Sequence, residues 1–314
     1  MSKIVEIINN MEKIMVGKRN VLERIVIALI TNGHVLIEDV PGVGKTQCVG
    51  ALAKSVHGSY KRVQFTPDVM ASDITGFTMY NPNVGEFEYR EGSANCNFLL
   101  GDEINRASSK TQSSLLEVME ERQITVDGVT RKVPEPFMVL ATQNPIESKG
   151  TNKLPEAQMD RFLFKLSIGY PTKEGEKEIL NRFQGENPLK TLQAVVTTHE
   201  IIEIQGQVEQ VKVSEEIKDL IINIVSYTRN NPSVDLGASP RGSLALLRVS
   251  KVIAFMKDRD YVIPEDVVEM AKDILCHRII LSSSARVKGI TANEVILDCV
   301  NRAIKYTSKV LENE

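Results

Sequence analysis

Short apolar runs alternate with amphipathic stretches over the first half of the chain. The apolar runs have the length of strands, and helical periodicity fills the intervals between them. The predicted strands span residues 34–38, 62–65, 97–101, 137–142 and 162–168. Strands that alternate with helices in this way predict an α/β fold, a parallel sheet with helices on both faces.

The periodicity becomes purely helical after residue 171. Apolar residues from Ile217 to Val225 follow helical spacing, and Arg241 stands at the head of another helix, expected over residues 243–256. Ser214 is expected to cap the helix of Ile217 to Val225. Two further helix starts are marked at Pro264 and at Thr291 with Glu294. We therefore predict an α/β core in residues 1–171 and an all-helical domain in residues 172–314.

Composition and charge narrow the class of protein. The 314 residues are 42% hydrophobic and 25% charged, and the net charge is −3, so no basic excess favours nucleic acid or an anionic membrane. No apolar run has transmembrane length, and the first residues have the pattern of an amphipathic helix rather than a signal sequence. The four cysteines are scattered, which is typical of free thiols in a reducing compartment. We expect a cytoplasmic protein.

A phosphate-binding loop is predicted where an apolar strand runs into the sequence VPGVGKT. Gly42 and Gly44 let the backbone turn tightly, so that successive N–H groups point at one spot near the start of a helix. Lys45 can reach the terminal phosphates, and the Thr46 hydroxyl can ligate Mg²⁺; the alternative is a plain glycine-rich turn. Asp39 stands where the general pattern has its first glycine, and we expect the loop to accommodate it because Asp tolerates unusual backbone angles.

A second candidate element follows downstream, where the apolar run FLLG ends in Asp102 and Glu103. Asp102 at the carboxyl end of a strand can hold Mg²⁺ through water, and Glu103 can orient and activate an attacking water. Acids also end buried strands without any catalytic role, but the phosphate-binding loop upstream favours the catalytic interpretation.

Asn144 places a polar amide at the tip of the next apolar strand. Its side chain can hydrogen-bond the γ-phosphate or the water, although an Asn-Pro turn is also a common strand ending. The spacing implies that this strand lies between the strands of the two preceding elements. That order would bring Asn144 near the γ-phosphate.

These segments occur with others in a recognisable order. The segments are VGK (16–18), DVPGVGKT (39–46), FTPDVMASDITG (65–76), DEINRA (102–107), ATQNP (141–145), MDRF (159–162) and GASPR (237–241). Over nearly its whole length the chain resembles the MoxR family of AAA+ ATPases. The resemblance implies an AAA+ P-loop NTPase core with a C-terminal helical lid, ATP and Mg²⁺ as cofactors, and a homo-oligomeric ring, usually a hexamer.

The resemblance also implies a role for individual residues. The implied nucleotide site consists of Val16, Gly17, Pro41, Gly42, Val43, Gly44, Lys45, Thr46, Gln47 and Asp102, with Mg²⁺ on Thr46 and Asp102. Glu103 completes Walker B, and Asn144 is sensor 1. Arg161 matches the arginine finger offered to a neighbour's ATP, with a salt bridge to Asp160 or a nearby acid as the alternative. Arg241 matches sensor 2, with a solvated helix start as the alternative.

Two insertions mark the subclass. Residues 77–97 correspond to a helix-2 insert, and residues 123–133 are predicted to form a presensor hairpin around an Asp127-Gly128 type I′ turn. Both can also be inert surface loops. Segment 91–97 departs from the family pattern, which puts partner contact through it in doubt.

Two functions from different classes remain open. The family resemblance favours a chaperone-like ATPase that remodels a partner protein, often one with a von Willebrand A domain. Related rings with the same insertions include nucleic-acid motors, and Arg131 and Lys132 after the hairpin turn keep that alternative open. The slight acidic balance favours the remodeller. A weaker third option is an ATP-binding module with negligible hydrolysis, against which Glu103 and Arg161 argue.

Overall fold

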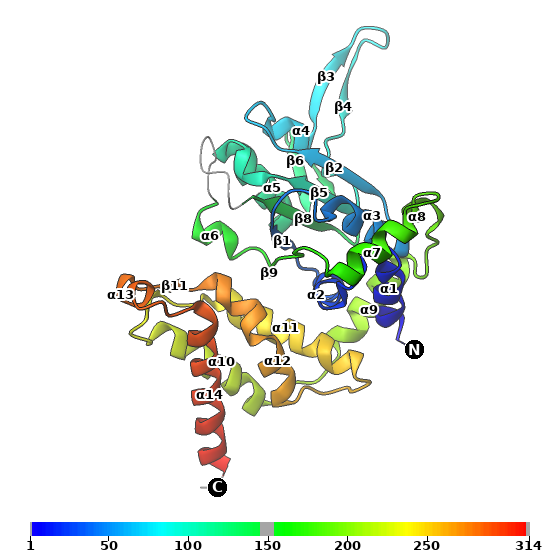
Figure 1. Ribbon diagram of the computed structural model, residues 1–314. Helices are drawn as coiled ribbons and strands as arrows, with labels where there is room; N and C mark the ends of the chain where they lie inside the picture. Colours follow the sequence, from blue (N-terminus) through cyan, green and yellow to red (C-terminus); the bar gives the residue numbers. More distant parts are fainter. Residues whose placement is uncertain (1, 145–153, 312–314) are drawn as a thin grey trace. The chain divides into compact units, whose positions relative to one another are not determined.

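The computed structural model describes residues 2–144 and 154–311 (Figure 1). The chain forms two compact units, of which the first comprises Met1–Leu154 and Leu166–Glu203 and the second Pro155–Lys165 and Ile204–Glu314. The short segment Pro155–Lys165 thus groups with the C-terminal unit. The sequence alone suggested a single boundary after residue 171.

A five-stranded sheet forms the centre of the α/β core. Its strands, in spatial order, are β2 (Tyr60–Gln64), β5 (Phe98–Asp102), β8 (Met138–Gln143), β1 (Val35–Glu38) and β9 (Phe164–Leu166). The pairs β2–β5, β5–β8 and β8–β1 are parallel. Residues of β1, β5 and β8 are buried almost throughout, which explains why their sequences are continuous apolar runs. The predicted parallel sheet is confirmed, and β8 lies between β5 and β1 as its spacing implied.

Strand β9 is shorter at both ends than the sequence predicts. Before it, the carbonyls of Phe162 and Leu163 accept hydrogen bonds from the guanidinium of Arg278. After it, the N–H of Ile168 donates to the carboxylate of Asp39. Backbone groups that are occupied in this way do not extend the ladder of the sheet.

Helices accompany the sheet in the first unit. They are α1 (Lys3–Glu12), α2 (Arg19–Ile30), α3 (Lys45–Ser55), α4 (Ala71–Thr75), the 3₁₀ turn Ile104–Arg106, α5 (Ser109–Glu121), α7 (Lys173–Arg182) and α8 (Pro188–Thr191). In α1 the residues Ile4, Ile7, Ile8 and Met11 are completely buried, as expected of an amphipathic helix. Each such side chain contributes about 1.5–3 kcal/mol by leaving water. No helix within 2–144 or 154–311 is long and apolar enough to cross a membrane.

Both predicted insertions contain β-hairpins. The first pairs β3 (Phe77–Asn81) with β4 (Glu86–Arg90) and extends away from the rest of its unit in Figure 1. The second pairs β6 (Gln123–Val126) with β7 (Val129–Lys132). Asp127 and Gly128 have φ of 52° and 77°, the two positive values that a type I′ turn requires.

Segment 91–97, the part that departs from the family pattern, closes the base of the first hairpin. Ala94 and Cys96 are completely buried, and the N–H of Ala94 donates to the carbonyl of Ile74 at 3.0 Å. A Cβ at Gly92 would lie 2.2 Å from the same carbonyl, so only glycine fits there. The segment anchors the insertion to α4.

The second unit is helical, as expected of a lid. Its elements are α6 (Glu156–Met159), α10 (Glu215–Arg229), β10 (Val234–Leu236), α11 (Pro240–Met256), α12 (Pro264–Leu275), the 3₁₀ turn Cys276–Arg278, β11 (Ile280–Leu281), α13 (Ser283–Val287) and α14 (Ala292–Leu311). Helix α9 (Thr198–Glu209) carries the chain from the first unit into the second.

The predicted helix starts of this unit are largely confirmed. Pro264 opens α12, and the carboxylate of Glu294 accepts from the N–H of Thr291 at 2.7 Å, as a capping box requires. Ser214 occupies the N-cap of α10, but its side chain makes no capping hydrogen bond. Helix α11 begins at Pro240, three residues earlier than predicted, because Ser239 caps it.

Candidate active site

The phosphate-binding loop connects β1 to α3. Gly42 and Gly44 have φ of 87° and 91°, conformations that an L side chain rarely adopts. A Cβ at Gly44 would lie 3.4 Å from the methyl carbon of Met15, which packs against the loop. Lys45 is the first residue of α3, and Thr46 follows it, so both stand at the positive end of the helix dipole.

Asp39 anchors the start of this loop through its side chain. The carboxylate is buried and accepts hydrogen bonds from the N–H groups of Ile168 (2.6 Å) and Gly169 (2.8 Å) and from the Ser167 hydroxyl (3.1 Å). Asp39 is not among the described residues with positive φ. The hydrogen bonds of its side chain therefore explain why Asp39 fits at the start of the loop. Tolerance of unusual backbone angles, the reason expected from the sequence, is not needed.

Lys45 lies among carboxylates at the carboxyl edge of the sheet. Its ammonium group donates to the carbonyl of Asp39 at 2.7 Å. Burial lowers the pKa of Lys45 below its ordinary value, while the negative charges of Asp102, Asp39 and Glu103 act to raise it. The predicted Walker A lysine and both Walker B acids are thus within electrostatic reach of one another.

Thr142 links the two acids to the neighbouring strand. Its hydroxyl donates to Oδ1 of Asp102 at 2.6 Å and accepts from the N–H of Glu103 at 2.9 Å. The other carboxylate oxygen of Asp102 accepts from Arg62 on β2 at 2.7 Å. One hydroxyl therefore links both acids at the end of β5 to the polar end of β8.

Glu103 leaves the strand in a left-handed conformation, with φ of 57°. Its Oε2 accepts from the side-chain amide of Gln64 at 2.9 Å and from Arg106 at 3.0 Å. Non-glycine residues adopt this backbone conformation rarely, and they do so chiefly where surrounding contacts impose it, often at functional sites. The conformation turns the Glu103 side chain away from the path of its own strand.

The remaining predicted residues of the first unit lie near this edge or on the loop before α2. Asn144 follows β8 directly and is 8% exposed; Pro145 of its motif lies outside the described residues. Gly17 has φ of 67°, and Val16 precedes it between α1 and α2. Pro41 and Val43 belong to the phosphate-binding loop. Oε1 of Gln47 is buried and has no hydrogen-bond partner among the described residues.

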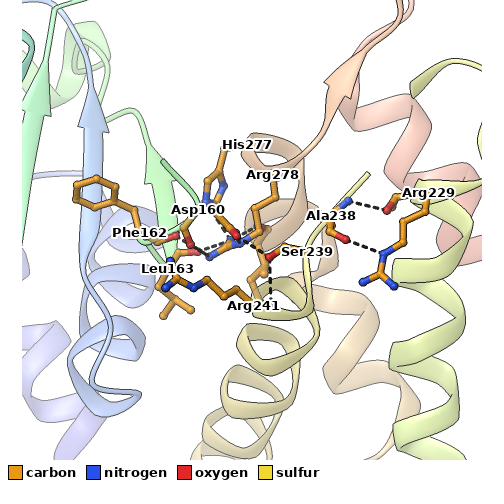
Figure 2. A network of polar contacts seen from close by, with 11 residues as sticks. Asp160, Phe162, Leu163, Arg229, Ala238, Ser239, Arg241, His277 and Arg278 are labelled. Atoms are coloured by element: carbon orange, nitrogen blue, oxygen red, sulfur yellow. Dashed lines mark hydrogen bonds and ion pairs between the residues drawn. The ribbon is translucent and has the colours of Figure 1, made fainter. Parts of the chain in front are cut away.

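Arg161 and Arg241 both belong to the second unit. Arg161 directly follows Asp160, and Arg241 lies in the first turn of α11. The carboxylate of Asp160, one of the alternative partners considered for Arg161, accepts hydrogen bonds from Arg278 and Ser239 (Figure 2).

Three residues of the site were missed by sequence reasoning. Thr142, Arg62 and Gln64 all contact the Walker B acids. Thr142 belongs to the ATQNP segment but was assigned no role, and Arg62 and Gln64 belong to no motif. The available signal was polarity, since Arg62 and Gln64 alternate along a predicted strand and Thr142 ends an apolar run. Polar residues at the carboxyl ends of neighbouring parallel strands are therefore candidate site residues even where they belong to no motif.

Comparisons with known proteins agree with this geometry. A model of the ATPase family associated with various cellular activities (AAA) matches residues 34–164, and an AAA lid domain model matches residues 226–299. The chain is 48% identical to the uncharacterized protein YeaC of Bacillus subtilis over 301 residues, which cover 96% of this chain and 93% of YeaC.

Two further relatives carry more informative descriptions. Chaperone MoxR1 of Mycobacterium tuberculosis is 42% identical over 294 residues, which cover 91% of this chain and 78% of that protein. The crystal structure of a protein from Cytophaga hutchinsonii, assigned as an ATPase, has a TM-score of 0.89 at 41% identity and covers 95% of this chain and 93% of its own. With a matching core, a matching lid and this extent of identity, the chain belongs to the MoxR family of AAA+ ATPases.

Proposed function

We propose that this protein hydrolyses ATP in a Mg²⁺-dependent reaction. The supporting observation is that Lys45 opens α3 after β1, while Asp102 ends β5, Glu103 follows it, and both acids are bonded to the end of β8, the strand between β5 and β1. A cationic side chain and a helix N-terminus attract phosphate, and an adjacent acid can activate water. A phosphate cradle without such an acid would support binding alone.

The residues present fit both Mg²⁺ and a nucleotide. Thr46 and Asp102 offer a hydroxyl and a carboxylate, the oxygen ligands that Mg²⁺ prefers, and the ion would neutralise charge on the phosphates when bound. To bind the ion, the carboxylate of Asp102 would have to give up its hydrogen bond from Arg62. The unpaired oxygen of Gln47, next along α3, offers an acceptor to a donor group of the nucleotide.

Glu103 and Asn144 have separate roles in positioning and activating the attacking water. The carboxylate of Glu103 orients the water and takes its proton, which requires release from Gln64 and Arg106. The Asn144 amide donates a hydrogen bond to the γ-phosphate or holds the water.

The Glu103→Gln variant tests this assignment. The amide keeps the shape of the side chain but cannot take a proton, so MgATP should bind normally and turnover should fall at least about 10²-fold. Calorimetry and phosphate release measure the two quantities. Lys45→Ala should instead lose binding, and Glu117→Gln, an exposed acid on α5, should change neither. Undiminished turnover in Glu103→Gln would show that Glu103 is only a strand-end acid.

We further propose that the active form is a ring in which Arg161 completes the site of a neighbouring subunit. A permanently charged, forked guanidinium suits the charge that develops on the phosphate, and it makes hydrolysis depend on assembly. Arg161→Ala should bind ATP yet lose turnover. Mixing it with Lys45→Ala subunits should restore part of the turnover, because an intact phosphate site then meets an intact finger. Absence of rescue, with specific activity independent of protein concentration, would contradict the proposal.

The work of the ring, in this proposal, is to remodel a partner protein. The support is family membership and the description of the relative MoxR1 as a chaperone. A protein with a von Willebrand A domain is the client class that the family resemblance suggests, and the cytoplasm is the proposed compartment. The Glu103→Gln variant, which should hold ATP, should retain such a client from native cells more strongly than Lys45→Ala does. Equal recovery with both variants would count against ATP-dependent remodelling.

A further inference from the structure

Arg278 is a buried arginine at the end of the 3₁₀ turn that follows α12. Its side chain is 3% exposed, and its donors reach several acceptors of one short segment (Figure 2). It donates to Oδ1 of Asp160 at 2.8 Å, to the carbonyl of Phe162 at 2.7 Å and to that of Leu163 at 3.1 Å. It also donates to the carbonyl of Ile274 in α12. A buried charge is tolerated only with such complete pairing, so the segment that follows α6 is held to α12.

The same segment is bonded to the start of α11. The second carboxylate oxygen of Asp160 accepts from the hydroxyl of Ser239 at 2.6 Å. That hydroxyl in turn accepts from the N–H of Arg241 at 3.1 Å and caps the helix. One carboxylate therefore connects Arg278 to the turn that carries Arg241.

Electrostatics indicate that Arg241 itself lies close to this network. Burial lowers the pKa of Arg278 to about 10, Asp160 opposes the shift, and the charge of Arg241 adds to it. Arg278 remains protonated at neutral pH. The negative charge of Asp160 thus stabilises a cluster of positive side chains within one unit.

We propose that Arg278 is a positioning residue that joins the segment carrying Arg161 to the helix carrying Arg241, so that the two arginines move as one body. This inference rests on the proposed ATPase function and deepens it. Arg161 is the proposed finger for a neighbouring subunit, and Arg241 is the sensor 2 that the family resemblance implies. Because Arg278, Asp160 and Ser239 bond the two segments to each other, a displacement of one segment displaces the other.

The conservative variant Arg278→Lys tests the joint. Lysine keeps the charge but presents one donor group in place of a planar fork, so it cannot hold Asp160, Phe162 and Leu163 together. MgATP affinity should stay within about threefold, because the phosphate-binding loop is intact, while turnover per folded subunit should fall about tenfold to 10²-fold. Arg302→Lys is the control, since its ion pair with Asp298 at 2.9 Å is exposed on α14. Unchanged turnover in folded Arg278→Lys would overturn the proposal.

Subunit mixing tests whether Arg278 positions both Arg161 and Arg241 or supports Arg161 alone. Arg161→Ala subunits keep their own Arg241 in place, so Lys45→Ala subunits should rescue them. Arg278→Lys subunits would have both arginines displaced, so the same mixture should restore clearly less turnover. Equal rescue of the two variants would overturn the claim that Arg278 positions Arg241.

Amide hydrogen exchange supplies a readout that does not depend on activity. In Arg278→Lys, faster exchange should appear both in residues 160–163 and in the first turn of α11, with the phosphate-binding loop unchanged. Faster exchange confined to residues 160–163 would contradict the claim that Arg278 joins this segment to α11. That conclusion would hold even if the protein were not an ATPase. Full activity of Glu103→Gln and Arg161→Ala, by contrast, would refute the proposed function alone. If Arg278→Lys does not fold, Ser239→Ala removes the single hydroxyl between Asp160 and the start of α11 and carries the same tests.

Discussion

Asp39 shows how a single residue can depart from a motif and still serve it. The general pattern has glycine at this position because the loop must turn, yet here Gly42 and Gly44 supply the positive φ values. Asp39 instead binds the backbone that follows β9, and its own carbonyl accepts from Lys45. The sequence predicted tolerance of the substitution, but the contribution of the side chain became visible only with its partners.

Replacing Asp39 should therefore destabilise the first unit. Asp39→Ala leaves two backbone N–H groups near the protein interior without their acceptor, and we expect a loss of about 2–4 kcal/mol in the free energy of unfolding. Asp39→Asn retains one acceptor oxygen and should lose less. Asp68→Ala, an exposed acid in the same unit, should stay within about 0.5 kcal/mol of the wild type. Urea denaturation measures all three, and equal stability of Asp39→Ala and Asp68→Ala would contradict the anchoring role.

At the scale of elements, the position of β8 decides the site. Because β8 lies between β5 and β1, its carboxyl end brings Thr142 and Asn144 to the acids on one side and to the phosphate-binding loop on the other. The order of the three strands was predicted from spacing. The contacts made by Thr142 were not, because a hydroxyl at a strand end has no local signal that names its partner.

A buried histidine joins α5 to β8 and should make stability depend on pH. The Nε2 of His34 donates to the carbonyl of Met119 and its Nδ1 accepts from the N–H of Val139, both at 3.0 Å, so the ring is neutral. Burial lowers the pKa of His34 from 6.5 to about 4. The unfolded chain consequently binds more protons than the folded protein below pH 6.5. The stability contributed by His34 is complete above that pH and is lost as the pH falls toward 4.

The slope of stability against pH measures this contribution. Between pH 6 and pH 5 the free energy of unfolding of the wild type should decrease more steeply than that of His34→Gln, by up to about 1.4 kcal/mol per pH unit. The comparison uses slopes, so a general loss of stability in the variant does not affect it. Parallel slopes would mean that His34 titrates alike in the folded and unfolded chain.

At the scale of the whole molecule, the net charge distinguishes between the two classes of partner considered, nucleic acids and client proteins. The net charge is −3, and no observation on the site or its relatives favours nucleic acid. A motor on DNA or RNA must neutralise phosphates, so its affinity is high at low salt and falls steeply as salt rises. A remodeller of proteins has no such requirement.

Binding to nucleic acid should accordingly be weak under all conditions. We expect little binding of single- or double-stranded DNA or RNA at about 50 mM salt, and no stimulation of ATPase activity. Fluorescence anisotropy and phosphate release measure the two effects. Tight binding at about 50 mM that is lost by about 200 mM, together with stimulated hydrolysis, would reverse the order of the two functions.

Local sequence determined the elements and the motifs of this protein. The hairpin turn at Asp127 and the phosphate-binding loop follow from apolar runs and glycine positions, which act between near neighbours or along one element. Of the strand order, spacing predicted only that β8 lies between β5 and β1. Tertiary structure alone decided which side chains meet. Asp160 and Arg278 are 118 residues apart, and Thr142 and Asp102 are 40 apart, so only packing brings each pair together. For the same reason, only the tertiary structure groups the segment Pro155–Lys165, which carries Arg161, with the C-terminal unit.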